Sequence, residues 1–460
     1  MTRKSKVLIA AFAALALLGG GYYGAVAWKQ AKAEESSAGA APGSSVSLSS
    51  LDSSKIIRIE IPGTGLFLEK QGDLWELSPP AAVRLDQGKI ESALWSLGSL
   101  WAERVVEEEP GDLSVYGLDK TRPRTVVIDS EGGRADYLIG AMTPSRASYY
   151  VMTGEDPKVY AVSEYSVRNL LLDLDGIRDR SLLAPFEPQN LRRLILDTGK
   201  TRIDVSPKTE ADTGVSSFST FMLTSPYTRK QGVDGEKFGE FLAPLQSLQI
   251  RDFINDNPAS LGPYGLDNPM RLYVETDVSS LDLFLGNAEG DAYYAKKADS
   301  PEVFTVGGLE AVVNARAFTI VDKFALILNI DTVDRFVISE DAKALLTAEI
   351  KGKGDEAVFT LNGRKTADKP FRAFYQTVIG LLTDAEYSGP RPSNNPRGVI
   401  TIRYYLNTPP GQETAASLIP YNRDFYILDM DGTTEFLISR AQVQRIFDSA
   451  DSMEYAEDQD

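Results

Sequence analysis

The chain has 460 residues, with 48 basic against 65 acidic side chains, which gives a formal net charge of −17. A protein this acidic repels polyphosphate, and the sequence has no basic stripe interleaved with aromatic residues, so we expect no nucleic-acid partner. The chain contains neither Cys nor His. These two absences exclude disulfides, thiolate nucleophiles, Ser-His-Asp triads and the His- or Cys-based zinc and iron sites.

The N-terminus predicts export and membrane attachment. Residues 1–6 are basic and residues 7–28 form an apolar run, which as a helix would reach roughly 33 Å and cross a bilayer core of about 30 Å. We predict a cytoplasmic N-terminus (1–6), a transmembrane signal-anchor (7–28) and a flexible Ser/Gly/Ala linker (29–54). The Ala-Lys-Ala sequence at 31–33 leaves a cleaved, secreted form open as an alternative. Both alternatives place the body outside the cytoplasm, and the anchored form keeps it at the cell membrane.

The remainder of the chain repeats itself. Stretches that end at Ser163, Gly307 and Ser439 each contain an aromatic pair, a polar turn and a short apolar strand. The second aromatic residue lies 13 positions before the final small residue in each stretch, and that small residue can cap a helix. The pairs are Tyr149-Tyr150, Tyr293-Tyr294 and Phe425-Tyr426. We therefore predict a repeated unit of strand, turn, strand and helix.

The front halves of the repeats also match. Each opens with an apolar strand and continues to an Asp that begins a longer helix, at Asp86, Asp234 and Asp368. Apolar residues then recur at three-and-four spacing, which predicts one buried face on each helix. These residues are Ile90, Leu94, Leu97 and Trp101, then Phe238, Leu242, Leu245 and Leu248, and finally Phe371, Tyr375, Val378 and Leu382.

These patterns predict an α+β protein of three tandem repeated modules. Each module is expected to be a mainly antiparallel sheet with two packed helices, and one transmembrane helix precedes them all. The modules are expected at residues 55–188, 189–329 and 330–453, and the third is divergent. An acidic tail follows at 454–460.

The first two modules share a further motif. Tyr-Gly-Leu-Asp begins at Tyr116 and again at Tyr264, and each copy is followed by Pro (Pro123 or Pro269) and a strand. Leu-x-Gly at 138–140 then follows in the first copy and Phe-Leu-Gly at 284–286 in the second. The third module lacks this motif and has Asn-Asn-Pro at 394–396 instead. Together with the Tyr-Tyr pairs and Val-Tyr-x-Val, the motif resembles the bacterial family catalogued as domain of unknown function 4340.

The resemblance implies a role without assigning chemistry. Members of that family resemble auxiliary, membrane-tethered components encoded beside ABC transporters of the gliding-motility type. We accordingly expect a non-enzymatic interaction protein whose partners are the membrane and the permease and ATPase subunits of a transporter. The resemblance carries over no catalytic residue.

Six tyrosines are the candidate partner or ligand surface. They are Tyr116, Tyr149, Tyr150, Tyr264, Tyr293 and Tyr294. The competing interpretation is structural, with Tyr116 and Tyr264 as hydrophobic plugs beside glycines that adopt a special backbone angle. Because side chains alternate along a strand, one ring of each Tyr-Tyr pair should face the core. The other ring could bind cell-envelope glycan, which is the alternative function.

A carboxylate-based hydrolase is the remaining alternative. Without His, catalysis would need paired carboxylates or a Ser-Lys system, and the sequence contains no Ser-x-x-Lys, Gly-x-Ser-x-Gly or phosphate-binding loop. Two Asp-x-Asp-Gly sequences, at 173–176 and 429–432, lack the oxygen spacing of a calcium loop. We therefore expect no catalytic residue, no cofactor and no metal site.

Overall fold

The computed structural model describes residues 45–81, 83–119, 124–154, 156–212, 218–392, 396–408 and 410–456. The predicted cytoplasmic N-terminus, the signal-anchor and most of the linker lie outside these ranges, as do Pro123, Asn394, Asn395 and the end of the acidic tail. In the described residues, no helix is both long and apolar enough to cross a bilayer. The chain divides into two compact units, Met1–Asp179 and Arg180–Asp460.

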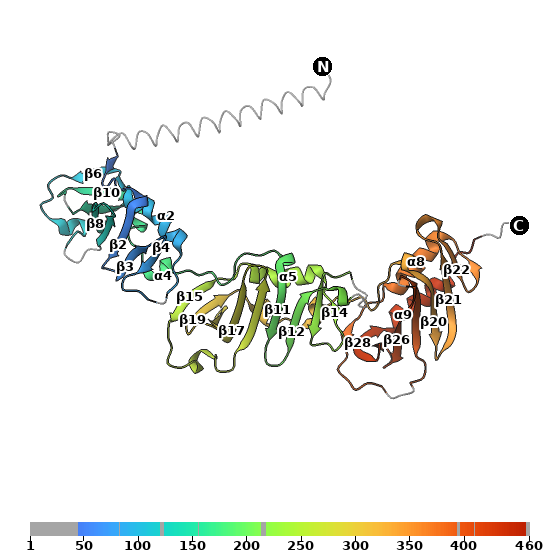
Figure 1. Cartoon of the computed structure of the whole chain (residues 1–460). Coiled ribbons are helices and arrows are strands. Elements are labelled where there is room, and N and C mark those ends of the chain that lie inside the picture. Colours follow the sequence, from blue (N-terminus) through green and yellow to red (C-terminus); the bar gives the residue numbers. More distant parts are fainter. Residues whose placement is uncertain are drawn as a thin grey trace, which may run out of the picture. The chain divides into compact units, whose positions relative to one another are not determined.

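The first unit contains one large antiparallel sheet, in blue to cyan-green in Figure 1. Its strand order is β4-β3-β2-β7-β8-β9-β10-β6. The strands are β2 (Ile56–Ile61), β3 (Leu66–Gln71), β4 (Leu74–Leu77), β6 (Arg104–Glu107), β7 (Arg124–Asp129), β8 (Arg134–Met142), β9 (Ser148–Thr153) and β10 (Val159–Ser163). A short pair, β1 (Val46–Ser47) with β5 (Trp101–Ala102), accompanies it. Its helices are α2 (Gln87–Gly98), α3 (Glu164–Arg168) and α4 (Leu174–Ile177).

The second unit begins with a sheet of order β14-β13-β12-β11-β16-β17-β18-β19-β15. The strands are β11 (Leu191–Asp197), β12 (Arg202–Pro207), β13 (Phe221–Ser225), β14 (Gln231–Gly232), β15 (Ile250–Asn255), β16 (Met270–Thr276), β17 (Ser280–Glu289), β18 (Ala292–Lys297) and β19 (Val303–Gly307). The helices are α5 (Gly235–Gln246), α6 (Glu310–Val313) and α7 (Ala317–Ile320). Figure 1 shows α5 lying along one side of this sheet.

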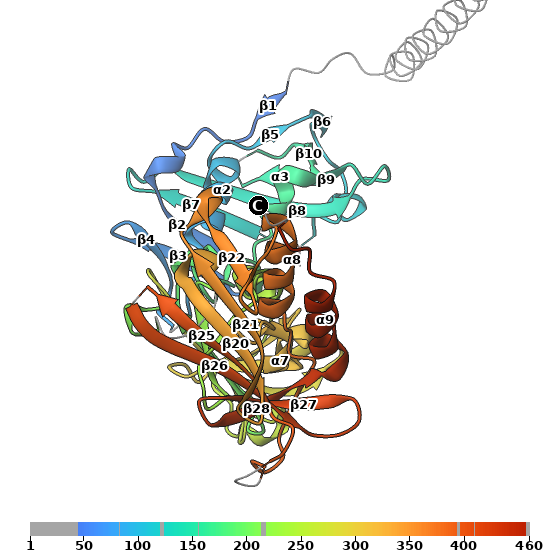
Figure 2. The same ribbon diagram turned by 90° about the vertical axis from the view of Figure 1, so that its right-hand side faces the viewer.

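The second unit continues with a sheet of order β23-β22-β21-β20-β25-β26-β27-β28-β24. The strands are β20 (Val333–Glu340), β21 (Lys343–Lys351), β22 (Val358–Leu361), β23 (Arg364–Lys365), β24 (Ala385–Glu386), β25 (Ile400–Asn407), β26 (Pro410–Pro420), β27 (Phe425–Met430) and β28 (Thr433–Ser439). Its helices α8 (Asp368–Ile379) and α9 (Arg440–Asp451) lie side by side in Figure 2 and contact each other.

The three large sheets share one topology. In each, the first strand lies in the middle, the next strands extend outward on one side, and the strands after the long helix fill the other side. The first strand of the same sheet after the helix then closes the far edge, as β6, β15 or β24. The expectation of mainly antiparallel sheets is confirmed, and the internal repetition read from the sequence recurs as strand order.

The long helices begin where the sequence predicts. Asp86 and Asp234 are N-caps whose carboxylates accept the backbone N–H of Lys89 and Lys237, while α8 begins at Asp368 itself. The first three positions of each apolar stripe are buried. The prediction for the fourth position is wrong, because each helix ends before it: Trp101 and Leu382 are 51% and 40% exposed, and Leu248 is buried beyond the helix.

The closing helices differ between the repeats. In the third sheet α9 is continuous, but in the first two sheets the predicted single helix is split, into α3 and α4 and into α6 and α7. Asn169 and Asn314 end the first halves. Asp173 then caps α4 by accepting the N–H of Gly176. Short Asn and Asp side chains compete for backbone hydrogen bonds and so favour helix ends over helix interiors.

Backbone pairing also fastens each sheet to the segments by which the chain enters and leaves it. The entering residues pair as Ser47 with Trp101, Ser181 with Gln249, and Phe324 with Leu382. The leaving residues pair as Leu85 with Arg178, Val233 with Val321, and Thr366 with Tyr455. In every repeat the entering residue meets the third residue after the long helix, so this contact belongs to the repeated fold.

Candidate functional site

The Tyr-Gly-Leu motif forms the same tight turn in the first two sheets. A 3-10 turn, Leu113–Tyr116 or Gly262–Tyr264, ends at Gly117 or Gly265. These glycines have φ values of 65° and 71°, in the left-handed region where other residues are strained. The sequence-based reason for these glycines is therefore confirmed.

The glycines of the Leu-x-Gly and Phe-Leu-Gly motifs, Gly140 and Gly286, are the partners of that turn. A Cβ atom on Gly140 would clash with the carbonyl oxygen of Tyr116, and a Cβ on Gly286 would clash with the carbonyl oxygen of Tyr264. Both glycines lie where the pairing of β8 with β9, or of β17 with β18, shifts register. Two motifs that are separate in the sequence thus form one contact, in which the turn fits against a bulged strand.

The candidate tyrosines meet in pairs across this contact. The rings of Tyr116 and Tyr150 lie 5.0 Å apart at 70°, and those of Tyr264 and Tyr294 lie 5.2 Å apart at 62°, both edge-to-face. Such pairs stabilise by about 0.5–1.5 kcal/mol beyond burial alone. All four rings are half-buried. This geometry favours the structural interpretation of these tyrosines.

The other ring of each Tyr-Tyr pair faces the opposite way, as the alternation predicts. Tyr149 and Tyr293 are half-buried and pack against the main hydrophobic cores. Tyr150 and Tyr116 belong instead to a small cluster with Leu118, on the other side of the sheet. The structure therefore brings the six tyrosines together as two separate pairs plus two core rings, and not as one continuous aromatic strip.

The phenol groups of the outer pairs contact carboxylates. The Tyr116 hydroxyl donates to Glu107 at 2.5 Å, and this hydrogen bond raises the pKa of Tyr116 above its ordinary value. A hydrogen bond to Glu289 likewise raises the pKa of Tyr294. Both phenols therefore stay protonated at neutral pH and act as donors.

The aromatic pair of the third sheet is offset by one residue from its sequence alignment. Tyr426 lies opposite Ile438, as Tyr149 lies opposite Val162 and Tyr293 opposite Val306. Tyr426 is thus the core-facing ring, although it is the second aromatic of its pair. Eleven residues separate Tyr426 from Ile438, against twelve in each of the other two hairpins, so the equal spacing counted from the second aromatic residue hides this offset.

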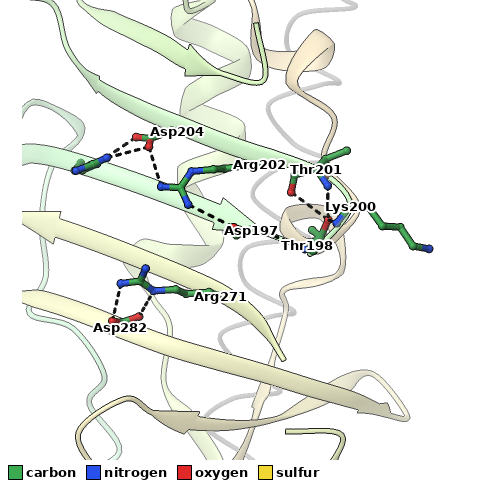
Figure 3. Close-up of polar contacts among 10 residues, drawn as sticks. Asp197, Thr198, Lys200, Thr201, Arg202, Asp204, Arg271 and Asp282 are labelled. Atoms are coloured by element: carbon green, nitrogen blue, oxygen red, sulfur yellow. Dashed lines mark hydrogen bonds and ion pairs between the residues drawn. The ribbon is translucent and has the colours of Figure 1, made fainter. Parts of the chain in front are cut away.

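The outer face of the second sheet carries a ladder of Arg–Asp ion pairs that the sequence reading missed (Figure 3). Arg193 on β11 donates two hydrogen bonds to the Asp204 carboxylate on β12, from Nε at 3.2 Å and from Nη2 at 3.0 Å. Arg202 bridges Asp204 and Asp197. On the next two strands of the sheet, Arg271 of β16 binds Asp282 of β17 through two hydrogen bonds of 2.8 Å.

Related pairs cross the equivalent strands of the other two sheets. In the first sheet Arg124 on β7 binds Asp136 on β8, and in the third Arg403 on β25 binds Glu413 on β26 at 3.2 Å. Each Arg reaches a carboxylate two residues beyond its register partner. The sequence signal for these ion pairs was the alternation of charged and apolar residues along a strand, as in Arg202-Ile203-Asp204, where charged residues flank a buried one. It does not say which charges meet.

The sequence reading also missed a cluster where the two sheets of the second unit meet. The Tyr227 hydroxyl donates to Glu386 at 2.7 Å, and its ring lies 4.9 Å from that of Phe436. Lys323 donates to the carbonyl of Phe318, and burial lowers the pKa of Lys323 to about 8 against the attraction of Glu386. The adjoining cavity is about 20 Å³, the size of one water molecule and too small for an organic ligand.

The described parts of the chain contain no group of three or more Asp or Glu residues placed to hold a metal ion. The two Asp-x-Asp-Gly sequences have other roles. Asp173 caps α4, and Asp429 accepts the N–H of Gly432 and pairs with Arg391 at 3.1 Å.

Comparison with known proteins identifies one family. The model described as Domain of unknown function (DUF4340) matches residues 75–269 and again residues 255–385, which together span more than half of the chain. No curated protein and no solved structure matches this chain. Both Tyr-Gly-Leu turns, the glycines Gly140 and Gly286 and both Tyr-Tyr pairs lie inside the matched residues, and the chain belongs to the DUF4340 family.

Proposed function

We propose that this protein is a non-enzymatic interaction protein, anchored in a bacterial membrane with its body outside the cytoplasm, and that it is an auxiliary component of an ABC-type transport system. In this proposal three tandem modules follow a single transmembrane helix. The apolar run at 7–28, the internal repeats and membership of the DUF4340 family support it.

One observation carries the interaction role: each sheet has a structured polar outer face. Helix residues such as Leu242 and Phe374 pack into the cores, so the outer face presents the Arg–carboxylate pairs to solvent. Arg193 and Arg271 keep 49% and 41% of their side-chain surface exposed while their guanidinium groups are fixed. Charges held in fixed positions favour specific polar partners, because little side-chain entropy is lost on binding.

Affinity capture tests the transporter role. The full chain is isolated from gently solubilised membranes, and we expect permease and ATPase subunits to be retained with it. The informative variant is R271D/D282R, which reverses the local charge pattern but preserves the ion pair and the net charge. We expect it to remain folded and to lose the transporter subunits.

A matched control lies on the helix side of the same sheet. Lys237 and Glu240 form an exposed pair on α5, 2.9 Å apart, and the K237E/E240K swap should retain the subunits. Recovery of no transporter subunit with the unaltered protein would refute the proposed role. If both swap variants retained the transporter subunits equally, the outer face of the sheet would not be the surface that binds them.

Glycan binding is the alternative from another class. The edge-to-face packing of Tyr116 with Tyr150 and of Tyr264 with Tyr294 gives these rings a structural use. Pull-down on purified cell wall separates the two functions: we expect no retention, and retention that is lost in Y150A or Y294A would favour glycan binding. A hydrolase has less support than either.

A further inference from the structure

Exposed aromatic side chains gather where the chain enters the first sheet. Trp95, Trp101 and Tyr165 are 68%, 51% and 77% exposed, and we call these three residues the entry patch. Trp95 and Trp101 are two of four tryptophans in the chain. Exposing rings of this size to water is unfavourable, and exposed apolar patches commonly mark sites of interaction.

Backbone contacts place the entry patch beside the entering segment. Ser47 lies opposite Trp101 in the β1–β5 pair, which Figure 2 shows at one edge of the first unit. The N–H groups of Leu48 and Leu51 donate to the carbonyls of Leu100 and Gly98, at 2.8 and 2.9 Å. The chain therefore enters along the segment that joins the end of α2 to β5, and Trp95 and Trp101 flank this segment.

Tyr165 belongs to the same region. The Asn169 amide donates to the Ser96 hydroxyl at 2.9 Å, which holds the end of α3 against the last turn of α2. Tyr165 lies four residues before Asn169 and Trp95 lies next to Ser96.

The number of residues between the proposed anchor and the first unit limits how far the entry patch can lie from the bilayer. Residues 29–44 separate the apolar run at 7–28 from the first described residue, Ser45. A segment of this length spans at most about 55 Å when fully extended.

We propose that the entry patch docks on the headgroup region of the membrane that holds the anchor. Tryptophan and tyrosine rings favour this region because they are apolar with one polar edge. Arg168 beside Tyr165 is paired with Glu164, and the chain carries a net charge of −17. The proposed docking therefore depends on the aromatic rings and not on charge attraction. This inference rests on the membrane anchor of the proposed function and adds a second membrane contact to it.

Tryptophan emission in vesicles tests the docking. The full chain, with Trp28→Phe to remove the emission of the anchor, is reconstituted into phosphatidylcholine vesicles containing brominated phosphatidylcholine. Trp75 is 2% exposed and should be insensitive to the bromines. We expect quenching of at least about twofold from Trp95 and Trp101, and its loss in W28F/W95F/W101F. High salt should leave the quenching unchanged.

A second comparison tests whether the three residues act together. In W28F/W95S/Y165S the remaining patch residue, Trp101, should be quenched less, whereas W28F/F218S, which alters a ring 77% exposed in the other unit, should behave like W28F. Failure of the protein to float with the vesicles would overturn the anchor and the docking together. Flotation with unquenched emission would overturn the docking alone.

Discussion

At the residue scale, single glycines show how the repeated motifs work. Gly286 and Gly239 belong to the same sheet unit, but a Cβ on Gly286 would clash with the Tyr264 carbonyl, while a Cβ on Gly239 would meet nothing within 4 Å. Sequence alone does not distinguish these two glycines. Their surroundings do.

We predict opposite effects of alanine at these two glycines. Gly286→Ala should destabilise the second unit by about 1–3 kcal/mol, because the backbone of the turn must move. Gly239→Ala, in the interior of α5, should stabilise it by about 0.5–1 kcal/mol. Urea unfolding of both variants measures the difference, and equal effects would refute the docking of turn on strand.

Lys323 gives the second unit a dependence on pH. Burial lowers its pKa to about 8 in the folded chain, whereas an unfolded chain holds the proton up to about 10.4. The unfolded state therefore binds more protons between these values, and the Lys323 contribution to stability rises with pH through that window. We predict that the wild type gains stability relative to K323M between pH 7 and 9.5.

Denaturant unfolding at several pH values checks this prediction. Lys237 serves as the control, because Glu240 raises the pKa of this exposed lysine and the comparison with K237M should show no such gain. A constant difference between the wild type and K323M across the pH range would contradict the prediction.

At the element scale, the three long helices differ in the residue that caps their N-terminus. Asp234 accepts the N–H of Lys237 at 2.9 Å, but Ala367, the N-cap of α8, has no side-chain oxygen with which to do the same. An N-cap acceptor is typically worth about 1 kcal/mol. We predict that Asp234→Ala lowers and Ala367→Ser raises the unfolding free energy by roughly this amount, measured by thermal denaturation. No change in either variant would refute the prediction.

The elements also show where sequence reading succeeds. The three-and-four apolar spacing gives the helices and their buried faces, because a helix repeats every 3.6 residues in any context. It overshoots at Trp101 and Leu382, which lie three residues beyond the helix ends. There the entering segment pairs with the backbone, as a short strand at Trp101 and as an isolated bridge at Leu382, and both contacts join residues far apart in sequence.

At the scale of the whole molecule, the two compact units differ in how they are built. The first has its own core around Ile59, Leu97 and Val151. In the second, one continuous core extends through both sheets, from Leu194 to Ile446, and Tyr227 and Phe436 pack together where the sheets meet.

We predict that residues 45–179 fold when expressed alone and that residues 180–456 unfold in a single cooperative transition. A fragment that ends at residue 322 should be less stable than the whole second unit, because Tyr227 and Phe318 lose Phe436. Calorimetry of the fragments measures this. Two separate transitions within 180–456 would show that the shared core does not couple its sheets.

The sequence by itself determined the repeat, the alternating strands, the helix faces, the Asp caps and the need for glycine after Tyr116 and Tyr264. These depend on backbone periodicity and local conformation, which neighbouring residues set. The tertiary structure alone decided that Gly140 meets the Tyr116 turn, that Arg271 meets Asp282, and that Lys323 lies buried near Glu386. Such contacts depend on strand register and bulges, where one residue more or less moves every side chain to the other face of the sheet.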